Sequence, residues 1–124
     1  MTHRILIADD EPNILISLEF LMKREGHEVL LARDGREALD TIRRERPELV
    51  LLDVMMPVLT GFEVCAAVKG DDELKATKVL MLTAKGRETD IAKGLAMGAD
   101  AYMTKPFSTR ELAERVRSML GPAA

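Results

Sequence analysis

Apolar residues follow two alternating patterns along the whole chain. Short continuous apolar runs are typical of buried strands, and longer segments with apolar residues every three or four positions are typical of helices. The runs predict five strands, over residues 4–8, 27–32, 49–53, 78–84 and 101–104. The periodic segments predict five helices, over residues 12 to about 25, around 38–42, about 62–69, about 88–97 and 108–119.

Residues that begin or end helices occur where these patterns change. Pro12 suits the first turn of a helix, and Gly26 and Gly98 follow the last apolar positions of two helices. We expect residues 34–35, Asp-Gly, to form a turn, and residues 108–111, Ser-Thr-Arg-Glu, to form a capping box. The sequence therefore predicts a strand followed by a helix, repeated five times.

Strands this apolar cannot face water on either side, which predicts a parallel sheet covered by helices on both faces. Right-handed crossover connections leave few arrangements of five parallel strands. The common one is the strand order 2-1-3-4-5 of doubly wound α/β proteins. We therefore expect an α/β fold, doubly wound, with a five-stranded parallel sheet and five helices.

Length and composition suit one soluble domain covering residues 1–124. The net charge of -3 provides no general attraction to nucleic acid, so we expect no direct nucleic-acid binding. One cysteine, Cys65, fits a reducing compartment and is interpreted as a small core residue. No apolar run is long enough to cross a membrane, and no signal peptide opens the chain, so we expect a cytoplasmic protein without membrane contact.

Acidic residues follow two of the apolar runs. Asp53 ends the run Leu49 to Leu52, and Asp9 and Asp10 follow the first strand. In the order 2-1-3-4-5 the first and third strands are neighbours, and ligands bind where their carboxyl ends meet. Three carboxylates that close together repel one another unless a cation lies among them. Oxygen ligands in this number favour Mg²⁺.

Two further polar side chains end strands on the same edge of the expected sheet. Thr83 lies near the end of the fourth strand, and Lys105 follows the fifth. A cation, a lysine and a hydroxyl together suit a phosphoryl group, and a carboxylate can itself be the nucleophile that accepts it. Singly, each residue has an ordinary structural interpretation. Asp9 and Asp10 could cap the helix that follows, and Thr83 and Lys105 could be a strand residue and a solvated loop residue.

Four segments of the chain resemble the receiver domain of two-component response regulators. They are ADDEP at 8–12, LLDVMMPVLTGFEV at 51–64, MLTA at 81–84 and GADAYMTKPF at 98–107. Each segment alone is weak, but together, in order on five strand–helix units, they are highly specific. The resemblance covers nearly the whole chain and implies the flavodoxin-like receiver fold.

The resemblance implies a role for each of these residues. Asp53 would accept a phosphoryl group from a histidine kinase or phosphotransfer protein. Asp9, Asp10 and Asp53 would bind Mg²⁺, together with the backbone carbonyl of Met55. The domain would be a signalling switch and not an enzyme, catalysing only its own phosphorylation and dephosphorylation.

The resemblance also implies a switch. Lys105 and Thr83 would contact the phosphoryl oxygens, and Tyr102 would move after Thr83. The surface formed by the fourth helix, fifth strand and fifth helix would then change, to act on a partner or on an output domain. The bond between Lys105 and Pro106 would be cis. Because Ile91 and Met97 stand where related domains carry charge, we expect at most a weak homodimer through this surface.

Some positions differ from the family pattern. Val58 and Thr60 replace a Gly and an Asp, and we expect the loop to adjust there without lost function. Met55 and Lys85 lie two residues past Asp53 and Thr83, where they would flank the path of water to an acyl phosphate. A thioether cannot orient that water, so we hypothesise slow self-dephosphorylation.

Two other functions fit part of this pattern. A Mg²⁺-dependent phosphatase for small molecules also uses an aspartate nucleophile, but it typically has a second acid at the position of Met55. A receiver-like binding module that is never phosphorylated would not need all of these polar residues. His3 and His27 lie at the starts of strands, at the end of the sheet opposite the acids, and we interpret them as structural or surface residues. Whether the domain acts alone or within a longer regulator stays open.

Overall fold

Each apolar run of the sequence forms a strand in the computed structural model, which describes residues 3–84 and 87–121. The strands are β1 (Arg4–Ala8), β2 (Glu28–Ala32), β3 (Leu49–Asp53), β4 (Lys78–Ala84) and β5 (Ala101–Lys105). They form one sheet in the order β2-β1-β3-β4-β5, and all of the neighbouring pairs are parallel. The predicted fold class and strand order are confirmed.

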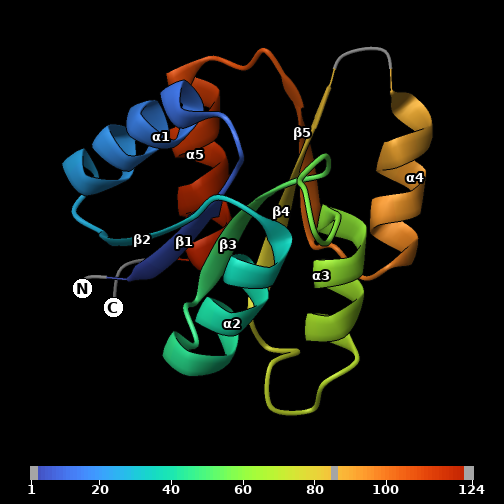
Figure 1. Cartoon of the computed structure of the whole chain (residues 1–124). Helices are drawn as coiled ribbons and strands as arrows, with labels where there is room; N and C mark the ends of the chain where they lie inside the picture. The colour runs from blue at the N-terminus through green and yellow to red at the C-terminus, as the bar shows by residue number, and fades with distance from the viewer. Residues whose placement is uncertain (1–2, 85–86, 122–124) are drawn as a thin grey trace.

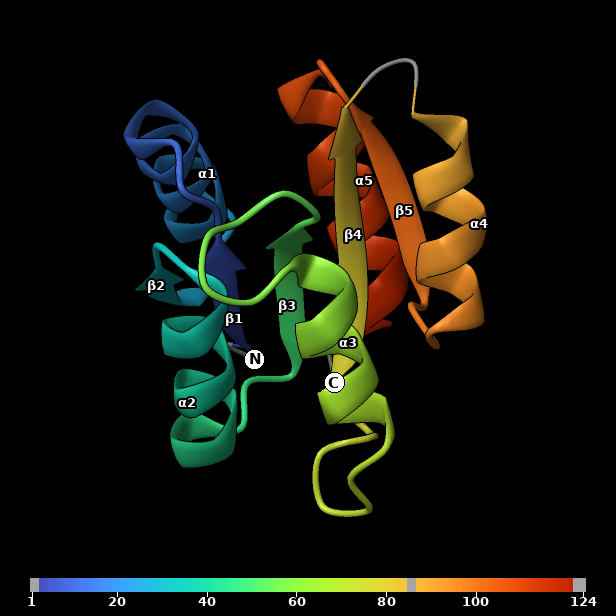
Figure 2. The ribbon, with the colours of Figure 1, turned by 45° about the vertical axis from the view of Figure 1, so that its right-hand side comes forward.

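Helices cover both faces of this sheet (Figures 1 and 2). They are α1 (Pro12–Arg24), α2 (Gly35–Glu45), α3 (Gly61–Lys69), α4 (Glu88–Ala96) and α5 (Thr109–Leu120). Helices α1 and α5 lie on one face, and α2, α3 and α4 lie on the other. The chain passes from β2 across β1 to β3, so the carboxyl ends of β1 and β3 are adjacent.

The apolar runs are buried because successive side chains of one strand enter two different cores. Leu6 and Ala8 of β1 pack against α2 and α3, whereas Ile5 and Ile7 pack against α1 and α5. All five residues of β3 are buried as well. Truncating a core residue such as Leu51 to alanine typically costs about 2–5 kcal/mol. This double core explains why the strands show no alternation of apolar and polar residues.

The starts of three helices differ from the sequence-based expectations. Asp34 does not form a turn with Gly35 but caps α2, because its side chain accepts a hydrogen bond from the backbone N–H of Glu37. Ser108 caps α5 in the same way, and the reciprocal bond of a full capping box is found instead at the start of α3. There Thr60 and Glu63 cap each other's backbone N–H groups. Thr60, a departure from the family pattern, is therefore a good helix cap.

Residues with a left-handed backbone end several of the helices, and two of these residues are the expected glycines. Gly26 and Gly98 both have positive φ, as the sequence predicted for the ends of α1 and α4. Arg46 ends α2 with φ of 47° before Pro47. Strand β2 begins one residue later than expected, at Glu28, and α3, α4 and β5 differ from expectation by one residue each.

Candidate functional site

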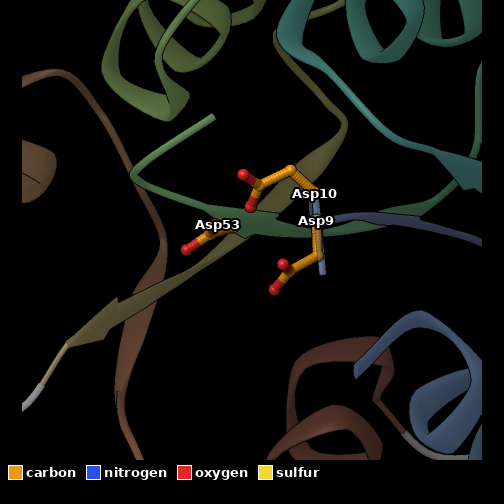
Figure 3. A group of neighbouring side chains, drawn as sticks. All are labelled: Asp9, Asp10 and Asp53. Carbon is orange, nitrogen blue, oxygen red and sulfur yellow. The ribbon is translucent and has the colours of Figure 1, made fainter. Parts of the chain in front are cut away.

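Three carboxylates meet at the carboxyl ends of β1 and β3 (Figure 3). Asp9 and Asp10 follow β1 directly, and Asp53 is the last residue of β3. One carboxylate oxygen from each residue lies within 4.8 Å of the other two. Asp9 is fully buried and Asp53 is 7% exposed, whereas Asp10 is exposed to solvent. The sequence-based expectation that these acids converge is met by the geometry.

Lys105 reaches into this cluster from the end of β5. Its Nζ donates to Oδ2 of Asp9 at 2.8 Å and to Oδ1 of Asp53 at 3.3 Å. Burial of the ammonium lowers its pKa, but the hydrogen bond to Asp9 and the charges of both carboxylates outweigh this effect. The pKa of Lys105 is therefore raised, and the side chain stays a cation among the acids.

The carboxyl group of Asp53 is poised between its two protonation states. Burial, followed by the negative charge of Asp9, raises its pKa to about 6, while Lys105 opposes this rise. The carboxylate is thus mostly ionised at pH 7. A pKa perturbed in this way, by burial and by a neighbouring charge, is common at functional sites.

Thr83, the last but one residue of β4, carries an unpaired hydroxyl. Its side chain is 1% exposed, and its Oγ1 has no hydrogen-bond partner within residues 3–84 and 87–121. Nearly all buried polar atoms in proteins have such a partner, so an orphaned hydroxyl needs an explanation. An oxygen-rich ligand bound at this edge of the sheet would supply one.

Asp9 also serves the local backbone. Its Oδ1 accepts a hydrogen bond from the backbone N–H of Glu11 at 2.9 Å, while Glu11 itself occupies the cap position of α1. The helix-capping interpretation therefore applies only to Asp9. Its carboxylate binds the N–H of the cap residue Glu11 and not an N–H group within α1. The side chain of Asp10 has no such contact among the described hydrogen bonds.

Gly61, the first residue of α3, allows the loop after β3 to close on the site. A Cβ at this position would lie 2.4 Å from the backbone oxygen of Asp53. The loop is held by a hydrogen bond from the N–H of Gly61 to the carbonyl of Val54. Sequence reasoning included Gly61 in the family motif but missed its steric role, which depends on two backbone segments that meet only in the fold.

Two of the remaining predicted site residues are exposed to solvent. Met55 has 56% of its surface exposed and Tyr102 has 41% exposed. The peptide bond between Lys105 and Pro106 is cis, as the resemblance implied. Lys85 lies outside the residues that the structure describes.

An apolar cleft beside the site was not expected from the sequence. It has a volume of about 540 Å³, and its lining includes Ile14 of α1, together with Lys105, Pro106 and Phe107. The cleft joins α1 to the segment after β5, which are far apart in the sequence. The spacing of apolar residues in α1 indicated that one face of the helix is buried. It could not show which edge of that face borders a cleft.

A divalent cation fits the donors that are present. Three carboxylates supply hard oxygen ligands, and within residues 3–84 and 87–121 the ion pairs that offset their crowding come from the ammonium of Lys105. The partly exposed position of the cluster would let water complete an octahedral shell, which Mg²⁺ prefers.

Comparison with known protein families identifies the chain. The family model for the response regulator receiver domain matches residues 5–117. The chain belongs to this family. Receiver domains are signalling domains that act with histidine kinases and output domains, so the carboxylate cluster lies in a domain of two-component signalling.

Solved structures of receiver domains are closely similar in fold. The chemotaxis response regulator CheY4 of Vibrio cholerae is 34% identical, with a TM-score of 0.90 over 96% of this chain and 99% of that one. The receiver domain of a signal transduction histidine kinase from Syntrophus aciditrophicus is 33% identical, with a TM-score of 0.90 over 96% and 90%.

A more distant receiver domain bears on the cation. It comes from a sensor histidine kinase of Pseudomonas aeruginosa PAO1 and has a magnesium ion coordinated in its active site cleft. It is 26% identical to this chain, with a TM-score of 0.89 over 98% of this chain and all of that one. Among the described residues of this chain, no helix is long and apolar enough to span a membrane.

Proposed function

We propose that this receiver domain accepts a phosphoryl group on Asp53 in a Mg²⁺-dependent reaction. One observation carries the proposal: a nearly buried carboxylate at the end of β3 lies among two other acids and within 3.3 Å of a lysine ammonium. In the reaction, a bond from phosphorus to a nitrogen or oxygen of the donor breaks as a bond from phosphorus to an Asp53 oxygen forms. The donor would be a phosphohistidine of a histidine kinase or phosphotransfer protein.

The residues of the chain divide the work of this step. Asp53 supplies the nucleophilic oxygen, which its pKa of about 6 leaves ionised at neutral pH. Lys105 places a positive charge next to the developing phosphoryl oxygens, where it is worth most because the surroundings are partly buried. Thr83 can donate its unpaired hydroxyl hydrogen to another of these oxygens.

The metal ligands in this proposal are Asp9, Asp10 and Asp53, with the backbone carbonyl of Met55. When bound, Mg²⁺ would neutralise the crowded acids and polarise the phosphoryl group. Asp9 is held ready for this role, because backbone and Lys105 contacts already orient its carboxylate.

Intact mass spectrometry after incubation with acetyl phosphate tests the proposal. We expect one added phosphoryl group that requires Mg²⁺ and is absent in Asp53→Asn. Asp72→Asn is the matched control, because the side chain of Asp72 is almost fully exposed and its ion-pair partner is not part of the carboxylate cluster. A folded wild-type protein without any adduct would contradict the proposal and favour a binding module that is never phosphorylated.

We further propose that Thr83 and Tyr102 form the switch. A hydrogen bond from Thr83 to the phosphoryl group would draw its side chain toward Asp53, and the ring of Tyr102 would move into the vacated space. The changed surface of α4, β5 and α5 would then act on a partner or on an output domain, and would support at most a weak homodimer.

The fluorescence of Tyr102 reports this switch directly, because the chain has one tyrosine and no tryptophan. We expect the emission to change on phosphorylation in the wild type and to stay constant in phosphorylated Thr83→Ala. Equal changes of emission in both proteins would show that the movement of the Tyr102 ring does not depend on the hydroxyl of Thr83.

The lifetime of the phosphoryl group is a separate part of the proposal. Met55 and Lys85 would flank the path of attacking water, and the exposed thioether of Met55 cannot orient that water by hydrogen bonding. Met55→Asn should therefore speed the loss of phosphate, with Met55→Leu as the apolar control. An unchanged or longer lifetime in Met55→Asn would refute the role of Met55.

The apolar cleft beside Lys105 is a suitable place for the phosphodonor protein to dock. It adjoins the site, and α1 also exposes Ile16 and Phe20 to solvent. Phe20→Ser should slow transfer from a phosphohistidine protein and leave phosphorylation by acetyl phosphate unchanged. Slowing of both reactions would indicate damage to the site itself. A cytoplasmic location, without direct nucleic-acid or membrane binding, completes the proposal.

A further inference from the structure

The two histidines of the chain lie together at the opposite end of the sheet from the carboxylate cluster. Strands β1 and β2 pair in parallel with Arg4 opposite Glu28, so His3 and His27 are opposite each other one position earlier. The backbone N–H of Glu28 donates to the carbonyl of His3, which continues the ladder to this point. The ring centroids are 5.7 Å apart, and the ring planes are inclined by 50°.

A carboxylate orients the first of these imidazoles. Glu48, which directly precedes β3, is hydrogen-bonded through its Oε2 to Nδ1 of His3. A carboxylate only accepts hydrogen bonds, so Nδ1 of His3 carries the proton of this bond, and Nε2 is the nitrogen left for another ligand. This is the arrangement by which proteins commonly orient a metal-binding histidine.

The second imidazole has a buried nitrogen without a partner. Nδ1 of His27 makes no hydrogen bond within the part of the chain that the structure describes. Burial, and next the neighbouring His3, lower the pKa of His27, while Glu25 and Glu48 act in the opposite direction. The unpartnered Nδ1 of His27 is therefore open to a ligand from outside the protein.

We propose that His3 and His27 bind a divalent transition-metal ion, with Zn²⁺ as the test ion, and that Glu48 positions His3 for this purpose. Metal–nitrogen bonds of about 2.0–2.1 Å place the centroids of two ligating rings roughly 5–6 Å apart, which matches their separation here. Neutral imidazole nitrogens suit zinc, copper and nickel, whereas Mg²⁺ prefers the oxygen ligands of the other site.

Solvent can reach the proposed site from the side of His3, because the adjoining cleft is lined by His3 and not by His27. A cleft of about 360 Å³ is lined by His3 and Glu48, together with Lys78 and residues that end α5. Water from this cleft would complete the coordination of an ion held by two protein ligands. A bound ion would tie the starts of β1 and β2 together, and through Glu48 the start of β3. It would stabilise the fold by mass action, independently of phosphorylation at Asp53.

Nuclear magnetic resonance of the histidine side chains tests the proposal at both rings directly. Because the chain has two histidines, their ring-nitrogen signals are assigned simply with His3→Gln and His27→Gln. Zn²⁺ should shift the ring-nitrogen resonances of both residues, with saturation at one ion per chain. The titration is made with excess Mg²⁺ in the Asp53→Asn protein, so that the carboxylate cluster does not contribute.

Isothermal titration calorimetry of variants then assigns the roles. His3→Gln and His27→Gln should each weaken Zn²⁺ binding at least tenfold, and Glu48→Gln should weaken it by about 10–100-fold. Lys78→Gln, which changes another residue of the same cleft, should bind Zn²⁺ like the parent protein. Circular dichroism establishes that each variant is folded.

The proposal is overturned if Zn²⁺ leaves the ring-nitrogen signals unchanged, or shifts those of only one histidine. It is equally overturned if His27→Gln binds Zn²⁺ as tightly as the parent protein, because the ion would then be held elsewhere. Neither result would affect the proposed phosphorylation of Asp53, which is measured at the other end of the sheet.

Discussion

Asp53→Asn should make the metal-free domain more stable at neutral pH. In the folded protein the Asp53 carboxylate is 7% exposed and close to a second buried acid, Asp9. Lys105 compensates for this only in part, because the pKa of Asp53 is still raised from 3.8 to about 6. The ionised group is therefore less favourable in the folded chain than in the unfolded one, and an isosteric amide removes that penalty.

The size and the sign of the effect follow from proton linkage. Between pH 3.8 and about 6 the folded state binds more protons at Asp53 than the unfolded state. The free energy of unfolding therefore falls as pH rises through this window and stays low above it. A rise of the pKa from 3.8 to about 6 corresponds to about 3 kcal/mol, so Asp53→Asn should gain about 2–3 kcal/mol at pH 7 and little at pH 4.

Urea denaturation of both proteins between pH 4 and pH 7.5, without divalent cations, measures this difference. The matched control Asp72→Asn changes an exposed carboxylate and should alter stability by less than about 0.5 kcal/mol at either pH. Added Mg²⁺ should stabilise the wild type more than Asp53→Asn, because the variant lacks one ligand. A gain at pH 4 as large as that at pH 7, or no gain at pH 7, would refute the reasoning.

Four other substitutions or reactions test the fold. Val58 has φ of 73° and 72% exposure, so Val58→Gly should stabilise the domain by about 0.5–1 kcal/mol in urea denaturation, because relief of left-handed strain exceeds the entropic cost of glycine. Gly61→Ala should destabilise it by about 1–3 kcal/mol in the same assay, since the new methyl group meets the Asp53 carbonyl. Lys69 donates to two backbone carbonyls and to Asp100, so Lys69→Met should lower the midpoint of thermal unfolding, by the equivalent of about 2 kcal/mol. Burial raises the pKa of the Cys65 thiol to about 11, so its reaction with a disulfide reagent at pH 8 should be slow and should speed up only as urea unfolds the protein.

Much of the fold could be predicted from the sequence because its signals are local and repeated. The run from Leu49 to Asp53 is apolar at four consecutive positions, which only a strand covered on both faces can accommodate. Pro12 and Gly26 mark the ends of α1 through their own backbone preferences. The convergence of Asp9 with Asp53 also followed from the sequence, since the order of parallel strands places their carboxyl ends side by side.

Other features could not be predicted because they depend on which side chains meet in three dimensions. The capping partners of Thr60 and Asp34 were missed because a turn and a helix start have similar local sequences. Val58 replaces a glycine of the family pattern, but its left-handed backbone depends on a loop that meets the start of α2, where the N–H of Gly35 donates to the carbonyl of Pro57. The pairing of His3 with His27 requires the register of β1 and β2, which is set by the burial of both strands.

The sequence by itself determined the order of elements, the parallel sheet and the edge at which the acids gather, because hydrophobic periodicity and strand order are properties of the chain. Only the tertiary structure decided the balance of charge within that edge. Lys105 is 96 residues from Asp9 in the sequence, yet its ammonium bonds to that carboxylate and shares its charge with Asp53. The raised pKa of Asp53 and the unpaired hydroxyl of Thr83 both arise from burial, and burial depends on the packing of the whole domain.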